Sequence, residues 1–485
     1  DLHKAIRRQR QMCIRDRTDK DYDPLKDPSI DQSLLGHTYQ VVMPMTVTKV
    51  KDGHTVENTA TQVTNDKRDK TNTVTNPLKE INPTKDVTVK VGGDSIDGKS
   101  VYLNHTFLYR LDSSILPPDR AYQTVTDWGG TDQLNTEYDQ YLGNWAVYAS
   151  RDLYRDGQML AAKGEKIAGS GFDSSKFGGN LFTVDADDNG KVTVNATQTY
   201  LDLVSADNEH EAGWVLYLQC KRIAVADEVP NTWTETINGQ PRESNKVVTK
   251  TPDMTPSIHL EKVDTPTLKQ DGQEQADRDD PKQALKMDAD NIGITFIITN
   301  TSKTDPATGD GAWYKASDLN LDDSTIVGDA HVDMDSLTYP DNWDTLVLKP
   351  GESVSVTGTL KGVKEGDTHT DRAIVTGTPL VECAPSNGDP FNDKTDGGED
   401  TDPEYSTGDV TEIDGKQLCA DTQTTSNTDD WNGYRAKPLA STGAAVLGLA
   451  GGALAVLLAG GSLLVFRKRH CAQGSGRHTA VNAGK

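Results

Sequence analysis

Apolar residues in this chain recur in short runs in which Val, Ile and Leu alternate with Thr and other polar residues, and turn signals separate the runs. Leu346–Leu348 and Val354–Leu360 flank Pro350-Gly351, a pattern that predicts a hairpin. Ile237-Asn238-Gly239-Gln240 carries the Asn-Gly pair typical of a type I′ turn. Helical spacing of apolar residues is nearly absent. The chain is therefore predicted to be all-β, with tandem β-sandwich domains or related barrels.

Length and charge limit the classes of function. The 485 residues are enough for two to four domains at the usual ~100–200 residues each. A net charge of −24 argues against nucleic acid as a partner, since phosphate binding needs clustered Lys and Arg. Only 34% of the residues are hydrophobic, so the cores must rely on β-branched and aromatic side chains.

Shifts in composition divide the chain into segments. The first 17 residues are basic, unlike the acidic chain that follows, and contain no apolar stretch of the kind that a signal peptide needs. Their end, Gln11-Met12-Cys13-Ile14-Arg15-Asp16-Arg17, resembles a translated sequencing adapter, so we expect them to be non-native. After Cys383 the sequence becomes acidic, rich in Gly and poor in apolar residues, which predicts disorder. The expected segments are 1–17, the end of a truncated adhesin-type domain at 18–80, a complete domain at 81–257, an Ig-like sandwich at 258–382, a disordered spacer at 383–438 and a tail at 439–485.

The tail has three parts in a fixed order. The pentapeptide Leu439-Ala440-Ser441-Thr442-Gly443 precedes an uncharged apolar run from Ala444 to Phe466, and three basic residues follow. A run of this length predicts one transmembrane helix, and the basic cluster would stay on the cytoplasmic side. Everything before the run should therefore lie outside the cell.

This tail resembles the sorting signal that sortases of Gram-positive bacteria read. Ala440 stands where the usual signal has Pro, as in the variant signal of high-GC Gram-positive bacteria. The resemblance implies cleavage between Thr442 and Gly443, with sortase and peptidoglycan as partners and the cell wall as the location. The alternative is an ordinary single-pass membrane anchor.

The domain at 81–257 resembles the C-terminal adhesin domains of streptococcal antigen I/II surface proteins. The resemblance rests on Pro83-Thr84-Lys85-Asp86-Val87, on Phe107-Leu108-Tyr109-Arg110-Leu111 and on Ser244-Asn245-Lys246-Val247-Val248. It implies a spontaneous isopeptide bond between a Lys of the first strand and an Asn of the last.

By this resemblance Lys85 is the nucleophile, Asn245 the acceptor and Asp127 the assisting acid, with Asp112 and Asp132 as rivals for the last role. Burial favours a neutral amine and a neutral carboxylic acid, which is the pair that the reaction needs. The alternative is a surface Lys, a turn Asn and a solvated Asp.

Two further sites of this kind are suggested. Asn58 in Val56-Glu57-Asn58-Thr59-Ala60 resembles the acceptor of a preceding domain whose Lys is absent from this chain. Lys262 and Asp371 occupy first-strand and late-strand positions of the Ig-like domain, where a Lys–Asp bond is conceivable.

The cysteines suggest one disulfide and one buried thiol, and one acidic loop matches a calcium site only in part. Cys383 and Cys419 flank one polar loop and are candidates for a disulfide in an oxidising exterior, while Cys220 is expected to be a buried thiol. Asp185, Asp187 and Asn189 match the first half of a calcium loop, but position twelve is Ala196 where a bidentate Glu is needed. A polar hairpin turn is the favoured interpretation, and no other metal or cofactor is expected.

Together these patterns predict a wall-anchored surface adhesin that serves as a stalk and presents a distal region to an unknown host or bacterial receptor. A sortase-polymerised pilus subunit is one alternative, although Tyr339-Pro340-Asp341-Asn342 lacks the Lys of a pilin motif. An exported wall enzyme is another, although the nucleophile motif Gly-x-Ser-x-Gly is absent from the sequence. We expect that the chain is not an enzyme.

Overall fold

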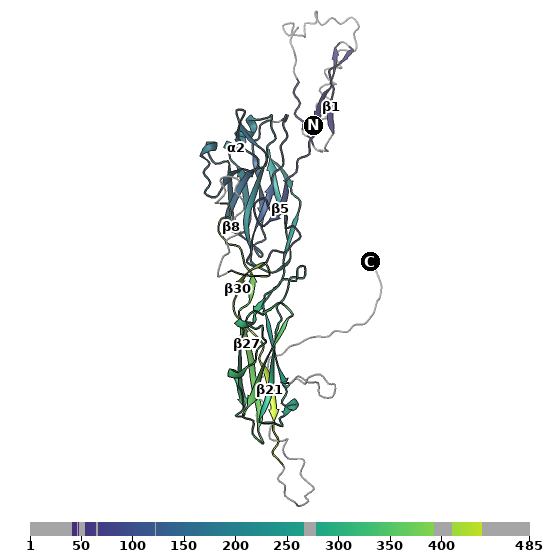
Figure 1. Cartoon of the computed structure of the whole chain (residues 1–485). Coiled ribbons are helices and arrows are strands. Elements are labelled where there is room, and N and C mark those ends of the chain that lie inside the picture. The colour runs from purple at the N-terminus through teal and green to yellow at the C-terminus, as the bar shows by residue number, and fades with distance from the viewer. Residues whose placement is uncertain are drawn as a thin grey trace, which may run out of the picture.

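The computed structural model describes residues 41–45, 47, 54–64, 66–121, 123–265, 278–391 and 410–438. Two β-sandwiches lie end to end along the molecule (Figure 1). Residues 84–251 form the middle domain, and strands between Ile258 and Tyr434 form the C-terminal domain. The all-β prediction is confirmed for the described residues.

Before the middle domain, four short strands form two antiparallel pairs, β1 with β4 and β2 with β3. Their side chains are exposed wherever burial is defined. The strands are β1 (Thr55–Asn58), β2 (Thr61–Thr64), β3 (Lys67–Lys70) and β4 (Val74–Pro77).

The middle domain contains two five-stranded antiparallel sheets. Sheet 1 has the order β11-β8-β14-β6-β5, and sheet 2 has the order β12-β13-β7-β16-β17. The strands of sheet 1 are β5 (Thr84–Thr88), β6 (Thr106–Asp112), β8 (Asp139–Ala149), β11 (Lys166–Gly169) and β14 (Trp214–Arg222). Those of sheet 2 are β7 (Trp128–Gln133), β12 (Phe182–Ala186), β13 (Lys191–Ala196), β16 (Trp233–Ile237) and β17 (Gln240–Glu243).

Smaller elements close this sandwich. Strands β9 (Leu153–Arg155) and β10 (Gln158–Ala161) form a hairpin, and β15 (Ala226–Asn231) pairs with β18 (Val247–Thr251). The helix α2 (Gln198–Ala206), which the sequence patterns did not predict, buries Tyr200, Leu201, Leu203 and Val204. A 3-10 turn, η2, spans Ser175–Phe177.

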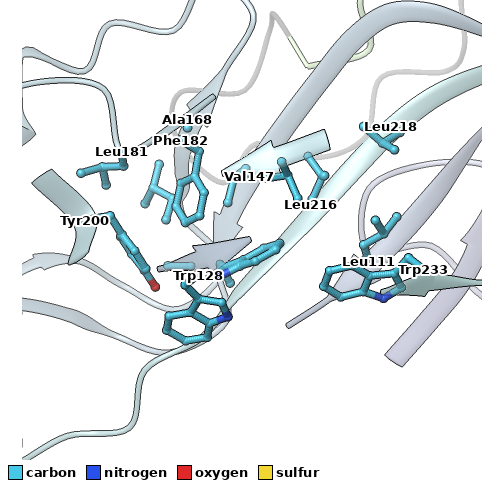
Figure 2. Packing of buried hydrophobic residues seen from close by; sticks show 14 of the residues in the cluster. Leu111, Trp128, Val147, Ala168, Leu181, Phe182, Tyr200, Leu216, Leu218 and Trp233 are labelled. Carbon is cyan, nitrogen blue, oxygen red and sulfur yellow. The ribbon is translucent and has the colours of Figure 1, made fainter. Parts of the chain in front are cut away.

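Large aromatic side chains fill the space between the two sheets. Trp214 packs against the rings of Phe182 and Trp233, with ring centroids 5.3 and 5.8 Å away. Trp128 and Tyr200 add to the same cluster (Figure 2). Few but large side chains thus give this polar chain a core, as its composition requires.

The C-terminal domain has two main sheets. Sheet 3 has the order β19-β21-β26-β24, and sheet 4 has the order β20-β32-β27-β23, with β31 also paired to β27. The strands of sheet 3 are β19 (Ile258–Thr265), β21 (Asn291–Asn300), β24 (His331–Val332) and β26 (Ser353–Lys361). Those of sheet 4 are β20 (Leu285–Lys286), β23 (Asn320–Val327), β27 (Thr368–Gly377), β31 (Thr424–Thr425) and β32 (Asp429–Tyr434).

Two smaller sheets complete this domain. They pair β22 (Tyr314–Lys315) with β25 (Val347–Leu348), and β30 (Lys416–Ala420) with both β28 (Leu380–Glu382) and β29 (Thr411–Ile413). Three 3-10 turns lie at Pro281–Gln283, Ala316–Asp318 and Met334–Ser336.

The segment after β28 connects the two domains physically. Phe391 is 1% exposed because it packs among residues of sheet 1, including Leu108, Val215 and Tyr217. Its carbonyl oxygen accepts a hydrogen bond of 2.9 Å from Lys166 Nζ. The C-terminal domain therefore holds the middle domain through a buried aromatic anchor.

The structure corrects two predictions. Residues 410–434 of the expected disordered spacer form strands, and β32 completes sheet 4 with Trp431 fully buried. Pro350-Gly351 does not close a hairpin, because β25 pairs with β22 whereas β26 pairs with β21. The interior of the spacer, residues 392–409, lies outside the described residues.

In the part of the chain that the structure describes, no helix is long and apolar enough to cross a membrane. The predicted pentapeptide and the apolar run Ala444–Phe466 lie outside that part, as do residues 1–17.

Replacing the anchor tests the contact between the domains. Phe391→Ala should cost about 3 kcal/mol of docking energy, the usual loss for a buried Phe. Small-angle X-ray scattering should then show a broader distribution of interdomain distances in the full chain. Tyr339→Ala, at a residue 42% exposed in the C-terminal domain, is the matched control. An unchanged scattering curve for Phe391→Ala would contradict the anchor.

Candidate functional site

The Lys85 side chain points into the middle domain. Along β5, Lys85 and Val87 face inward while Thr84 is exposed, so strand alternation carries the lysine into the core. The side chain of Lys85 is 0% exposed. A buried ammonium group needs a partner because the interior does not solvate its charge.

Asp132 provides that partner from the opposite sheet. It lies on β7, where Trp128, Gly130 and Asp132 share the inner face. Its Oδ2 accepts a hydrogen bond from Lys85 Nζ, and its Oδ1 has no hydrogen-bond partner. Gly130 permits the close packing of this strand, because a Cβ there would lie 2.7 Å from the Trp233 ring. The pair therefore bridges the two sheets.

The surroundings of Lys85 favour the neutral amine. Burial lowers the pKa of Lys85, and the Asp132 carboxylate opposes this shift without cancelling it. Nζ also lies 4.4 Å from the centre of the Tyr109 ring. Cys220 is buried and free, as predicted, and burial raises the pKa of its thiol well above the ordinary value. A lowered pKa is the direction that a nucleophilic amine requires.

A second buried ion pair lies beside the first. Arg222 Nε is 2.9 Å from Asp139 Oδ1, and Tyr109 Oη donates a 2.8 Å hydrogen bond to Asp139 Oδ2. Arg222 also donates to the hydroxyl groups of Thr249 and Thr251. Both carboxylate oxygens of Asp139 are thus engaged by Arg222 and Tyr109, and Asp132 is the acid that contacts Lys85.

The other acids considered from the sequence lie elsewhere. Asp127 precedes β7, and its Oδ2 accepts from the backbone of Gly239 in the β16–β17 turn. Asp112 forms an ion pair of 2.7 Å with Arg110. Among the three acids weighed from the sequence, the structure brings only Asp132 to the amine of Lys85.

Asn245 lies beside Lys85, but its amide contacts the backbone. Its Oδ1 accepts from Lys85 N and its Nδ2 donates to Lys85 O, both at 2.9 Å. The residue is exposed. The side-chain amide of Asn245 therefore bonds to the backbone of β5 as a neighbouring strand would. Because both of its polar groups contact this backbone, the geometry does not match the predicted role of Asn245 as acceptor for the buried amine.

Asn231 has the properties expected of an acceptor, although the sequence analysis missed it. It is 6% exposed, and its Nδ2 has no hydrogen-bond partner. It pairs with Val247, and two residues later Trp233 pairs with Asp132 and donates to Thr84 O. Asn231 thus lies next to the strands that carry Lys85 and Asp132.

A repeated pattern could have revealed Asn231. Val56-Glu57-Asn58-Thr59-Ala60-Thr61 and Val229-Pro230-Asn231-Thr232-Trp233-Thr234 share the sequence Val-x-Asn-Thr-x-Thr. Asn58, already suggested as an acceptor, lies in β1 and corresponds to Asn231 in this pattern. Asn245 has no counterpart in it.

The remaining predicted sites are simple structural features. Cys383 and Cys419 form a disulfide with Cα atoms 4.9 Å apart. Asp187 lies in the turn between β12 and β13, and its Oδ1 accepts from the backbone of Asn189 and Lys191. The described residues contain no cluster of His, Cys, Asp or Glu that could hold a metal ion; Asp185 lies in β12, and Asp187 and Asn189 lie in the hairpin turn that follows it.

Comparison with known proteins gives the domain type. Residues 82–252 match the family described as cell surface antigen C-terminus, and residues 7–78 match the cell surface antigen I/II C2 terminal domain. An aggregation substance of Enterococcus faecalis is 35% identical over 233 residues, which are 47% of this chain and 17% of that protein. The chain therefore spans about a sixth of this relative.

Solved structures give similar matches. The C-terminal domain of the Streptococcus pyogenes antigen I/II-family protein AspA is 29% identical and has a TM-score of 0.36, covering 41% of this chain and 54% of that one. The C-terminal domain of the Streptococcus agalactiae AgI/II polypeptide BspA is 23% identical with a TM-score of 0.36, covering 41% and 58%.

The family matches support a Gram-positive surface adhesin with antigen I/II-type C-terminal domains. The matched families and relatives are surface antigens and an aggregation substance, so the expectation of a non-enzymatic protein agrees with them.

The backbone contacts of Asn245 predict a modest effect on stability. Asn245→Ala removes two hydrogen bonds and should lower the free energy of unfolding by about 1–2 kcal/mol, as measured by urea denaturation of the full chain. Asn342→Ala, at another exposed residue, serves as the control. If both variants unfold at the same urea concentration as the parent chain, the amide of Asn245 contributes nothing to the attachment of β5.

Proposed function

We propose that this chain is part of the stalk of a cell-surface adhesin, and that a Lys85–Asn231 isopeptide bond closes its middle domain. The observation that carries the proposal is the buried contact between Lys85 and Asp132, inside a domain that matches the antigen C-terminus family. The stalk would hold a distal binding region away from the cell, toward a receptor on a host or bacterial surface.

The reaction needs only the groups already described. Asp132 takes a proton from the Lys85 ammonium, which leaves a neutral amine beside a neutral acid. Nζ attacks Cγ of Asn231 while the Asp132 hydroxyl group donates a hydrogen bond to the amide oxygen. The surplus proton on the attacking nitrogen passes through Asp132 to Nδ2, the bond from Cγ to Nδ2 breaks and ammonia leaves, while Asp132 keeps the proton that it took from the ammonium. The unpaired Nδ2 of Asn231 supports this assignment, because it is the nitrogen that departs.

The bond would change stability and mechanics. Closing a loop of roughly 150 residues removes about 5 kcal/mol of unfolded-state entropy on the disulfide model. The link would also join β5 to the end of β15, two residues before β16 of the other sheet begins. A pulling force that enters at β5 would be carried by the covalent bond. The strands of the sheet would then not be separated one by one.

Mass spectrometry of the full chain tests this bond. We expect a loss of one ammonia, located in a cross-linked peptide that contains Lys85 and Asn231. Lys85→Ala and Asn231→Ala should abolish the loss, whereas Asn245→Ala should retain it. A cross-link at Asn245 would overturn the choice of acceptor, and a full-mass chain with free Lys85 would overturn the bond.

We further propose that sortase attaches the chain to peptidoglycan through Thr442. The proposal rests on the order of pentapeptide, apolar run and basic residues at 439–469. The full chain, produced in a Gram-positive host with sortase, should appear in the wall fraction and end at Thr442 after peptidoglycan digestion.

Single substitutions make this test specific. Thr442→Ala should move the protein out of the wall fraction, while Ser441→Ala at the variable position should leave it there. Protein in the medium that still carries residues after Gly443 would argue against sorting. A ladder of covalent multimers in the digest would instead support the pilus alternative.

A further inference from the structure

A second buried lysine lies in the C-terminal domain, outside the residues that the antigen families match. Lys262 lies on β19 of sheet 3, and its side chain is 0% exposed. Two acids reach it from the opposite sheet, Asp323 on β23 and Asp371 on β27. This arrangement is independent of the middle domain and of the function proposed for it.

The two acids make different contacts with the amine. Lys262 Nζ donates a hydrogen bond to Asp323 Oδ2. Nζ is also 2.6 Å from Asp371 Oδ1, but neither oxygen of Asp371 accepts a hydrogen bond and its side chain is 0% exposed. Asp371 thus lies against the amine without the hydrogen bonds that normally stabilise a buried carboxylate.

The cluster contains more acid than its one lysine can neutralise. Two carboxylates and one ammonium in a closed interior would leave an unpaired negative charge, which is costly. Burial, reinforced by the nearby Asp371, raises the pKa of Asp323 to about 6, although Lys262 opposes the shift. His369 is the fourth group, with Nε2 3.1 Å from Asp371 Oδ2. Four titratable side chains thus lie in contact in this interior.

Backbone contacts fix the lysine in this position. Lys262 N donates to Asp429 Oδ2 on β32, and Asn427 holds the backbone of Leu260 through bonds of 2.9 Å at both its N and O atoms. The Phe296 ring lies 5.3 Å from Nζ. The amine is thus held against Asp371 by packing on several sides.

We propose that Lys262 and Asp371 condense to an intramolecular isopeptide bond that joins sheet 3 to sheet 4. The Lys262 ammonium first gives one proton to Asp371, so that a neutral amine faces a neutral acid. Nζ then attacks Cγ of Asp371 and passes its second surplus proton to Asp323. Oδ2 already carries the first proton and receives the second from Asp323, directly or through His369, so the bond from Cγ to Oδ2 breaks and this oxygen leaves as water. Overall, one ammonium and one carboxylate become one amide and one water, with no other reactant.

Asp371 is assigned as the acceptor because of its unsatisfied oxygens. The hydrogen bond from Nζ to Asp323 suits an acid that exchanges protons, and the short contact with Asp371 suits the group under attack. The product amide removes one positive and one negative charge from the interior, and this loss of buried charge favours the bond.

Peptide mapping of the reduced full chain tests the proposal. We expect a cross-linked peptide containing Lys262 and Asp371, lighter than the sum of its parts by one water. The proposed Lys85 bond releases ammonia from different peptides, so success or failure at one site is read separately from the other. Lys262→Met, a substitution of similar shape, should remove the loss of water while circular dichroism remains that of a β protein.

Asp371→Asn gives a sharper readout because it keeps the shape of the side chain. If Asp371 is the acceptor, this variant releases ammonia in place of water, and its linked peptide has the same mass as the linked wild-type peptide. Asp323→Asn should slow or abolish the reaction. A wild-type chain with an unlinked Lys262, or a cross-link at Asp323, would overturn the proposal.

Discussion

Each sandwich of this protein is organised around a lysine side chain that is buried between two sheets and contacts an acidic side chain from the opposite sheet. Such a pair contributes little net stability when it forms, but removing one partner typically costs 3–5 kcal/mol, because a charge is then left buried and alone. The strands that carry these groups must therefore stay in register. This constraint connects the two sheets in a chain whose apolar content is low.

Covalent bonds at these positions would define the path that a pulling force takes. In the C-terminal domain the path would run from Lys262 to Asp371, then along the chain to Cys383, across the disulfide to Cys419 and on to β32. The chain segments between Lys262 and Asp371 and between Cys383 and Cys419 would carry no tension. Phe391 belongs to the bypassed loop, so the contact between the domains could loosen without opening either sandwich.

Sequence patterns predicted the β architecture, the break between the domains at residues 257 and 258, and the two lysines that the structure buries. They did not separate Asp132 from Asp127, because that choice depends on which face of β7 is buried: Trp128, Gly130 and Asp132 share the inner face, and Asp127 precedes the strand. The strands between Thr411 and Tyr434 were missed because they are short and contain few apolar residues. Trp431, Leu418 and the disulfide anchor them, and none of these shows as an apolar run.

The two lysine sites share a framework but differ in the groups that face the amine. Asn245 holds the backbone of Lys85 from 160 residues away, and Asn427 holds Leu260 from 167 residues away, so both domains attach the first strand in the same manner. At Lys85 one acid faces the amine, and the nearby amide of Asn231 is already neutral. At Lys262 two acids face the amine, and an acid acceptor must gain a proton before its oxygen can leave as water. His369 Nε2 lies 3.1 Å from Asp371 Oδ2, where it could relay that proton. The side chains around each lysine thus differ in the way that the two proposed leaving groups, ammonia and water, would require.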